Sequence, residues 1–340
     1  MTAKNKRVIY IIIGILVAFS IVIGINTVSN LSPNKDEAYL YIDYDDDIDS
    51  VRAKLKQADA GVSMLAFNML NLYTGYSHHI RPGIYRITDD ISTLQLFRDL
   101  RNHNSNPVRL VLPSVRTVND LAGRLGHQLM LDSATIAHAL TDADFCDSIG
   151  YSRETVPTLF IPNTYEVYWE TSLNDFINRM KTENDRFWTG ERMNLADEIG
   201  MTKAEVMTLA SIVDSETANN AEKPRIAGLY MNRLNRGMLL QSDPTVIFAV
   251  GDFSIRRVVG KHLSVDSPYN TYKYKGLPPG PIRIASIAGI DAVLSYEHNN
   301  YIYMCAKEDF SGTHNFASSW AEHSANARRY AQALNKRGIR

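Results

Sequence analysis

Signatures of several common enzyme classes are absent from this chain of 340 residues. None of its nine histidines belongs to an HExxH pair, which holds zinc on one face of a helix. No GxxxxGKS or GxxxxGKT loop is present to hold a phosphate group. No serine stands in the G-x-S-x-G turn that exposes the nucleophile of an esterase. The sequence therefore predicts neither a metal site nor a cofactor.

Cysteine and excess charge are also scarce. The chain has only Cys146 and Cys305, which lie far apart and match no metal-binding spacing such as C-x-x-C. The two could pair if this part of the chain lies outside the cytoplasm. We favour two small buried residues instead, because a fold of this size needs no disulfide framework. The formal net charge of −1 gives no electrostatic reason to expect a nucleic-acid partner.

One long hydrophobic run stands near the N-terminus, from Val8 to Ile25. Its length of about 18 residues suits one helical crossing of a hydrocarbon core of about 30 Å. Lys4, Lys6 and Arg7 precede the run, which predicts a cytoplasmic N-terminus and an exported remainder. A cleaved signal peptide is the alternative, but its apolar core is usually only about 7–15 residues long. We therefore expect a cytoplasmic tail over 1–7, a membrane helix over 8–27 and a linker over 28–36, with the rest on the outer face of the cytoplasmic membrane.

The remaining sequence has the composition of an ordinary folded protein, with 45% apolar and 21% charged residues. It alternates like a strand over 39–44 and 83–87, and between them it has helical periodicity over 48–55 and 62–73. Asp47 or Asp49 is expected to cap the first of these helices. This pattern predicts a small β-α-α-β module over 37–106. Further helices and strands, among them a strand at 108–112 and a helix at 318–336, predict a larger mixed α+β domain over 107–340.

The densest set of signals lies between Leu209 and Thr245. It begins with a helix whose apolar residues recur at spacings of three and four, so that they share one face, and Glu216 follows in the same helix. A second amphipathic helix is expected after a break, with Pro224 in its first turn and Gly237 in a left-handed conformation at its end. The polar, turn-prone residues 241–245 come next. Two helices and a polar turn can thus bring two carboxylates and an amide into one cleft.

This stretch resembles the YceG-like family of endolytic murein transglycosylases. The matching residues are ASIVDSET from Ala210, NRLNRGMLLQSDPTV from Asn232, YNTY from Tyr269 and GLPPGPI over 276–282. The resemblance implies a LysM-like module ahead of a catalytic domain, although the β-α-α-β order fits a simple spacer equally well. It also implies cleavage of newly made peptidoglycan strands close to the membrane, with peptidoglycan synthases as neighbours.

A lytic transglycosylase needs only one carboxylate, which first protonates the glycosidic oxygen and then removes a proton from the C6 hydroxyl of N-acetylmuramic acid. The resemblance implies that Glu216 is this residue, and the apolar helix beside it favours the raised pKa that a neutral acid requires. Asp214 is the competitor. Because the two residues lie about 200° apart around a helix, both cannot face one site. We expect Asp214 to be a supporting or solvent-facing residue.

Around Glu216 the resemblance implies substrate-binding residues, each of which also has a purely structural interpretation. Gln241 can bind a sugar or stabilise its own turn. Asp243 can bind substrate, form an Asx-type turn or orient Asn232 or Arg233. The expected set is Gln241, Asp243, Thr245, Asn270, Tyr272, Asn232 and Arg233, with His314 as a further candidate. The segment 159–168, which contains Tyr165 and Glu166, is expected either to line a sugar subsite or to form core and turn.

Together these observations predict a membrane-anchored α+β enzyme acting on peptidoglycan glycan strands. It would cleave the β-1,4 bond between N-acetylmuramic acid and N-acetylglucosamine without water and leave a 1,6-anhydro end. One alternative is a glycan-binding scaffold without catalysis. Another is a hydrolytic muramidase, which would need a second positioned carboxylate such as Asp243 or Glu166.

Overall fold

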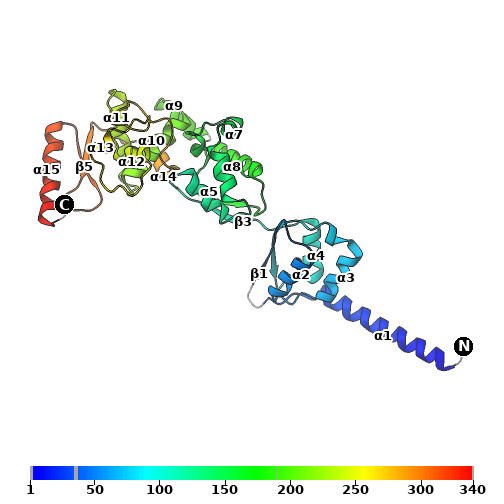
Figure 1. Ribbon diagram of the computed structural model, residues 1–340. Coiled ribbons are helices and arrows are strands. Elements are labelled where there is room, and N and C mark those ends of the chain that lie inside the picture. The colour runs from blue at the N-terminus through cyan, green and yellow to red at the C-terminus, as the bar shows by residue number, and fades with distance from the viewer. Residues whose placement is uncertain (1–2, 34–36, 189, 339–340) are drawn as a thin grey trace. The chain divides into compact units, whose positions relative to one another are not determined.

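The computed structural model describes residues 3–33, 37–188 and 190–338, and helices predominate in it (Figure 1). The strands of this part of the chain form three two-stranded sheets, β1–β2, β3–β4 and β5–β6. The expected mixed α+β class is therefore confirmed. Contacts divide the chain into two compact units. The first comprises Met1–Leu110, Gln128–Met130 and Glu166–Thr171, and the second comprises Val111–His127, Leu131–Tyr165 and Ser172–Arg340.

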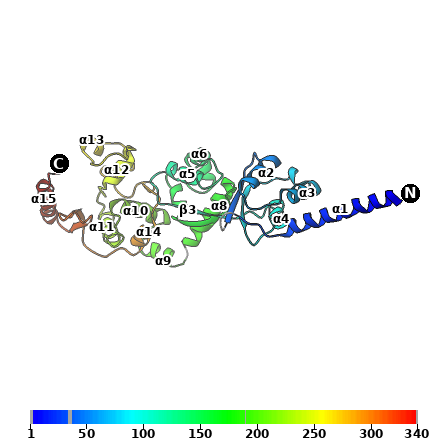
Figure 2. The same ribbon diagram turned by 90° about the horizontal axis from the view of Figure 1, so that it is seen from below.

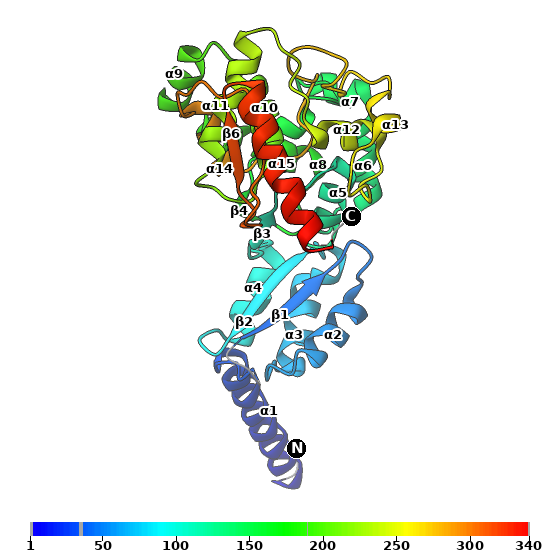
Figure 3. The same ribbon diagram turned by 90° about the vertical axis from the view of Figure 1, so that its left-hand side faces the viewer.

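The first unit is built on one antiparallel strand pair. Its elements are α1 (Ala3–Val28), β1 (Glu37–Ile42), α2 (Ile48–Gln57), α3 (Met64–Thr74), a short 3-10 helix (Tyr76–His78), β2 (Gly83–Thr88) and α4 (Thr93–Asn102). This confirms the expected order of strand, two helices and strand. β1 pairs with β2, with Tyr39 opposite Arg86, and α2, α3 and α4 lie on one side of the pair (Figures 2 and 3). Leu40, Ile42 and Ile87 are buried on that side.

Two segments of this unit differ from expectation, namely the end of β1 and the linker after α1. β1 ends at Ile42 rather than at residue 44, because the backbone N–H of Asp43 donates to the Asp46 side chain (2.7 Å) and closes a turn. Asp47 then caps α2 by accepting from two backbone N–H groups of the first turn. The expected linker is not free over its first half: Leu31 is buried, and its N–H donates to the Ile91 carbonyl (2.8 Å). Residues 34–36 of that linker lie outside the described residues.

The second unit is mostly helical. Two strands, β3 (Val108–Leu112) and β4 (Asn163–Val167), have residues in both units. The other elements of the second unit are α5 (Val118–Gly126), α6 (Ser133–Thr141), α7 (Ala143–Ser148), a 3-10 helix (Val156–Leu159), α8 (Leu173–Phe187), α9 (Gly190–Glu198), α10 (Lys203–Glu216), α11 (Lys223–Asn235), α12 (Asp243–Val250), α13 (Gly260–Leu263), α14 (Ile287–Leu294), β5 (Tyr303–Ala306), β6 (His314–Ala317) and α15 (Trp320–Lys336). α10, α11 and α14 pack against one another around the main apolar core. α15 packs on the β5–β6 hairpin (Figure 1).

Segment 159–168 belongs to the core and to a strand. Phe160 and Ile161 are buried, and residues 163–167 form β4, which pairs with β3. Tyr165 is buried, and its hydroxyl donates to the Ile161 carbonyl (2.6 Å). The structural interpretation of this segment therefore holds for Tyr165.

Candidate active site

α10 places Glu216 at the end of a buried helix. Thr202 and Glu205 form a capping box at its start. Contrary to the one-sided pattern expected, every residue from Val206 to Asp214 is buried, so neighbouring elements surround the helix. The helix ends because Thr217 is extended, with φ −145° and ψ 140°. α11 follows with Pro224 in its first turn, and Gly237 has φ +62°, as expected from the sequence.

Glu216 lines a cavity of about 240 Å³ within the second unit. Four of the expected site residues line the same cavity, namely Arg233, Gln241, Asp243 and Tyr272, and so does His314. The remaining lining residues are Leu229, Tyr230, Leu240, Met304, Cys305 and Ala306. Residues from α10, α11, α12, β5 and β6 thus meet at one polar cavity. Both cysteines are free, with Cys305 at this wall and Cys146 buried in α7.

One oxygen of Glu216 is held by two hydroxyl groups. Oε1 accepts hydrogen bonds from the Tyr230 hydroxyl (2.7 Å) and the Ser242 hydroxyl (2.6 Å). Burial raises the pKa of the Glu216 carboxyl, while the two hydrogen bonds and the nearby His314 oppose the rise and Asp243 adds to it. Among the described residues nothing bonds to Oε2, so this atom can carry a proton toward the cavity. A neutral carboxylic acid so placed can act as a general acid.

Asp243 is oriented by Tyr272. The Tyr272 hydroxyl donates to Asp243 Oδ1 (2.6 Å), and burial followed by this hydrogen bond raises the pKa of Tyr272, so the phenol remains a donor. The expected pairing of Asp243 with Asn232 or Arg233 is not what the described contacts show. Asp243 also begins α12, which starts where a polar turn was expected. The cavity therefore holds a second carboxylate besides Glu216.

Gln241 occupies a conformation that is unusual for a residue other than glycine. Its φ is +53°, in the left-handed region. The Thr271 carbonyl accepts from its N–H (3.1 Å), and its side-chain oxygen accepts from Arg233 (3.3 Å). Arg233 also donates to three carbonyls, those of Leu239, Leu240 and Ile302. Arg233 therefore fixes the chain that presents Gln241 to the cavity.

Three expected substrate-binding residues do not line the cavity. Asn232 donates to the carbonyls of Asn299 and Tyr301, and Asn270 donates to the carbonyls of Leu263 and Val265. Thr245 is fully buried and bonds to Ser242 and Thr271. All three hold loops in place around the cavity. Glu166, the alternative carboxylate, is exposed and is not among the cavity residues.

Sequence reasoning missed several residues of the cavity. Tyr230 lies in the second amphipathic helix expected from the sequence, and Ser242 lies between the candidates Gln241 and Asp243, but neither belongs to the expected set. Glu222 holds His314 at the wall: His314 Nδ1 lies 2.9 Å from Glu222 Oε2, and the His314 N–H donates to Glu222 Oε1 (2.7 Å). No local pattern joins these two residues, which come from distant parts of the chain. Among the described residues, no group of three metal-ligating side chains is assembled.

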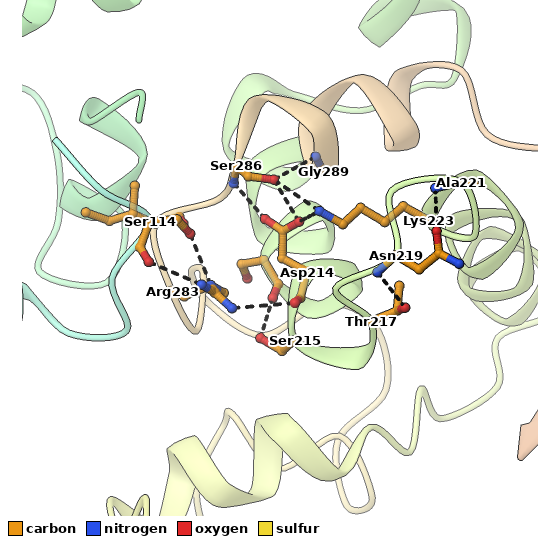
Figure 4. A network of polar contacts seen from close by, with 12 residues as sticks. Ser114, Asp214, Ser215, Thr217, Asn219, Ala221, Lys223, Arg283, Ser286 and Gly289 are labelled. Atoms are coloured by element: carbon orange, nitrogen blue, oxygen red, sulfur yellow. Dashed lines mark hydrogen bonds and ion pairs between the residues drawn. The ribbon is translucent and has the colours of Figure 1, made fainter. Parts of the chain in front are cut away.

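Asp214 lies in a network of polar contacts with Lys223 and Ser286 (Figure 4). Its Oδ1 lies 2.7 Å from Lys223 Nζ, and both side chains are buried. Its carboxylate also accepts from the N–H (2.6 Å) and hydroxyl (2.8 Å) of Ser286, the residue that caps α14. Asp214 was expected to be either a supporting or a solvent-facing residue, and these contacts show that it is a supporting one. Asp214 ties the end of α10 to the starts of α11 and α14.

Comparisons with known proteins agree with this architecture. The chain is 36% identical over 169 residues to the endolytic murein transglycosylase of Bacillus subtilis (strain 168), which covers 49% of this chain and 46% of that protein. It is 26% identical over 310 residues to the endolytic murein transglycosylase of Streptococcus pneumoniae serotype 2 (strain D39), covering 82% of this chain and 56% of that protein. The chain thus spans about half the length of these curated relatives.

A solved structure is similar over most of the chain. The crystal structure of a yceG-like protein from Listeria monocytogenes matches with a TM-score of 0.57 and 26% identity, covering 86% of this chain and 99% of that one. The model of the YceG-like family matches residues 40–329. This match extends over most of both units and includes every residue of the cavity. The chain belongs to the YceG-like family.

Proposed function

We propose that this protein is an endolytic lytic transglycosylase of peptidoglycan. The observation that supports this most is the cavity in which Glu216 has a raised pKa and an oxygen free of hydrogen bonds within the described chain. The names of the curated relatives support the same reaction. Of the residues expected to bind substrate, Gln241, Asp243, Tyr272 and Arg233 are proposed to contact the glycan. Asn232, Asn270 and Thr245 are proposed to act by holding the surrounding loops.

The proposed reaction uses Glu216 twice. The neutral carboxyl gives its proton to the oxygen of the β-1,4 bond as that oxygen leaves the anomeric carbon of N-acetylmuramic acid. The resulting carboxylate then takes the proton of the C6 hydroxyl of the same sugar, and O6 bonds to the anomeric carbon. Glu216 ends protonated again, and the strand ends in a 1,6-anhydro sugar. No water is consumed.

Hydrolysis is the second candidate function, because Asp243 lines the same cavity. A muramidase would use one carboxyl as acid and the other as base or nucleophile, at a separation of about 5–9.5 Å. The hydrogen bond from Tyr272 occupies one oxygen of Asp243 and suits a fixed substrate-orienting carboxylate better than a mobile base. Asp243 is therefore proposed as a binding residue.

Digestion in heavy-oxygen water separates the two reactions. Purified peptidoglycan is incubated with the full chain, and the muropeptides are analysed by mass spectrometry. A transglycosylase yields anhydro ends that carry no heavy oxygen, whereas a muramidase yields reducing ends labelled at C1. Labelled reducing ends in excess of those in an incubation without the protein would replace the proposed function with hydrolysis. If no new end is formed, the remaining alternative is a glycan-binding scaffold without catalysis.

The N-terminal part suggests where the reaction takes place. α1 is long and apolar enough to cross a membrane and fits a single-pass anchor. We propose that its N-terminus is cytoplasmic, because Lys4, Lys6 and Arg7 precede the apolar run. The β-α-α-β module is proposed to be LysM-like, and newly made strands emerging beside synthases are the proposed substrate. Protease protection of the tagged N-terminus in spheroplasts tests the orientation, since a cytoplasmic tag survives and an external one is lost.

A further inference from the structure

The outer side of α3 is mostly apolar and is exposed. The helix has the sequence MLAFNMLNLYT, which contains no charged residue. Ala66 and Phe67 turn into the core of the module. The other side carries Leu65, Met69, Leu72 and Tyr73, which are 46%, 49%, 83% and 92% exposed. It also carries the exposed Asn68, whose side-chain oxygen accepts from Arg52 (2.8 Å). Spacings of four, seven and eight residues place these four side chains on one face, called here the α3 apolar face. Contiguous exposed apolar patches mark interaction sites.

α3 packs directly against the apolar N-terminal helix. α1 contacts both α3 and α4. From Asn5 onward, Ile23 and Thr27 are the residues of α1 that are half-buried, while the others are exposed. Ile23 lies two residues before the end of the apolar run at Ile25, a rise of about 3 Å along the helix. The module therefore meets α1 at the level where its apolar run ends.

The segment that connects α1 to the module is short. α1 ends at Val28, and Leu31 is already buried in the module core. Asn30 forms a β-bridge with Ser92, and the Leu31 N–H bonds to Ile91. Three extended residues reach at most about 10 Å. A bilayer that surrounds α1 must therefore lie beside the module.

We propose that the α3 apolar face docks into the outer interface of the bilayer that α1 crosses. Burial in the interface removes four large apolar side chains from water, and the Tyr73 ring suits the headgroup level, where tyrosine is enriched. Arg81, which is exposed shortly after the helix, can meet anionic headgroups. α3 would then act as an interfacial helix beside a spanning one. This inference rests on the proposed membrane crossing of α1.

Nitroxide accessibility in proteoliposomes of phosphatidylcholine and phosphatidylglycerol tests the docking. Cys146 and Cys305 are replaced by alanine in the full chain, and one label is placed at a time through Leu16→Cys, Leu72→Cys or Tyr44→Cys. Leu16 reports on the proposed span. Tyr44 is an exposed aromatic residue of the same module, 73% exposed, and it follows β1 at the end away from α1 (Figure 3). Relaxation of each label by oxygen and by a water-soluble nickel complex is compared.

We expect the labels at 16 and 72 to respond more to oxygen, as lipid-embedded groups do, and the label at 44 to respond more to nickel. A label at 72 that behaves like the one at 44, while the label at 16 stays in lipid, would overturn the docking and leave the anchor intact. A water-exposed label at 16 would instead overturn the membrane crossing itself.

A charge substitution provides a second test. With the label moved to Tyr73→Cys, Leu72→Asp should raise its nickel accessibility severalfold, whereas the matched Tyr44→Asp should leave it unchanged. Both positions are exposed, so neither change should lower the unfolding temperature. Equal nickel accessibility in Leu72→Asp and the parent would also contradict the docking.

Discussion

The Tyr230 hydroxyl donates to Oε1 of Glu216 over 2.7 Å, across the junction of α10 and α11. Burial raises the pKa of Tyr230 well above its ordinary value, so the phenol stays protonated and can donate to Glu216. A donor stabilises the charged form of the carboxyl it contacts. Tyr230 therefore limits how far burial can raise the pKa of Glu216, and with Ser242 it fixes the orientation of the acid.

Tyr230→Phe should shift the pH dependence of the reaction. Without the donor, the Glu216 carboxylate is less stable, so the pKa of Glu216 rises further and the alkaline limb of kcat/KM moves to higher pH. The loss of one hydrogen bond should also lower the free energy of unfolding by about 1 kcal/mol. The measurement is a pH–rate profile beside chemical denaturation.

Tyr165→Phe is the matched control for Tyr230→Phe. It also removes a buried hydroxyl, which bonds to the Ile161 carbonyl and lies outside the cavity. It should lower stability by a similar amount and leave the pH–rate profile in place. A Tyr230→Phe profile that coincides with the parent would show that this hydrogen bond does not act on the catalytic proton.

Glu216→Gln should gain stability relative to the parent as the pH rises. Burial raises the folded-state pKa of Glu216 above the ordinary value of 4.5. Below that value the carboxyl is neutral in both states, so no difference arises from ionisation. Above it the unfolded state ionises first, and the parent loses stability until the pH passes the folded-state pKa. Across this window the free energy of unfolding of Glu216→Gln should rise relative to that of the parent. The exposed Glu191→Gln provides the baseline and should show no such rise. Parallel curves would contradict a raised pKa.

Lys223→Met should be strongly destabilising. It leaves the Asp214 carboxylate buried without its cation, and breaking one side of a buried ion pair costs about 3–5 kcal/mol. The exposed pair of Arg225 and Glu297 gives the control, because Arg225→Met should change the free energy of unfolding by no more than about 1 kcal/mol. Similar small losses of unfolding free energy in both variants, measured by urea denaturation, would show that the Asp214–Lys223 pair does not hold the helices together.

Gly289→Ala tests how tightly α14 is held against Asp214. A Cβ built at Gly289 lies 2.5 Å from Asp214 Oδ1, which Lys223 and Ser286 hold in place. Overpacking of this kind costs about 1–3 kcal/mol. Gly123→Ala in α5 is the matched change with nothing within 4 Å, and it should stabilise by up to about 1 kcal/mol through helix propensity. The unfolding temperatures of the two variants should therefore change in opposite directions. An unchanged unfolding temperature in Gly289→Ala would show that the contacts around Asp214 rearrange to accommodate the added methyl group.

Local signals allowed much of the fold to be predicted from the sequence. Asp47, Pro224 and Gly237 mark helix ends through their own backbone or capping chemistry, and each lies at such an end in the structure. β4 was missed because its partner β3 lies about fifty residues earlier, and a strand pair of that kind leaves no local pattern. The helix of Glu216 was expected to be amphipathic, but α10 is central to its unit and buried on all sides.

The candidate site was predicted less completely than the fold. Glu216, Gln241, Asp243, Tyr272 and Arg233 meet at one cavity, as the motif implied. Asn232, Asn270 and Thr245 share the motif but bond to backbone groups or buried hydroxyls. A motif alone does not separate residues that line a site from residues that hold its loops. The Glu222–His314 contact depends on tertiary folding and could not be predicted from spacing.

The most direct test of the central proposal is a comparison of the full chain with its Glu216→Gln variant on purified peptidoglycan. Gln is nearly isosteric and can still accept from Tyr230 and Ser242, but it has no proton to give to the glycosidic oxygen. We predict anhydromuramyl ends in the digest of the parent and at least about a hundredfold fewer in that of the variant. Circular dichroism should show that both proteins are folded. Equal numbers of anhydro ends would contradict the account, because another residue would then supply the catalytic proton.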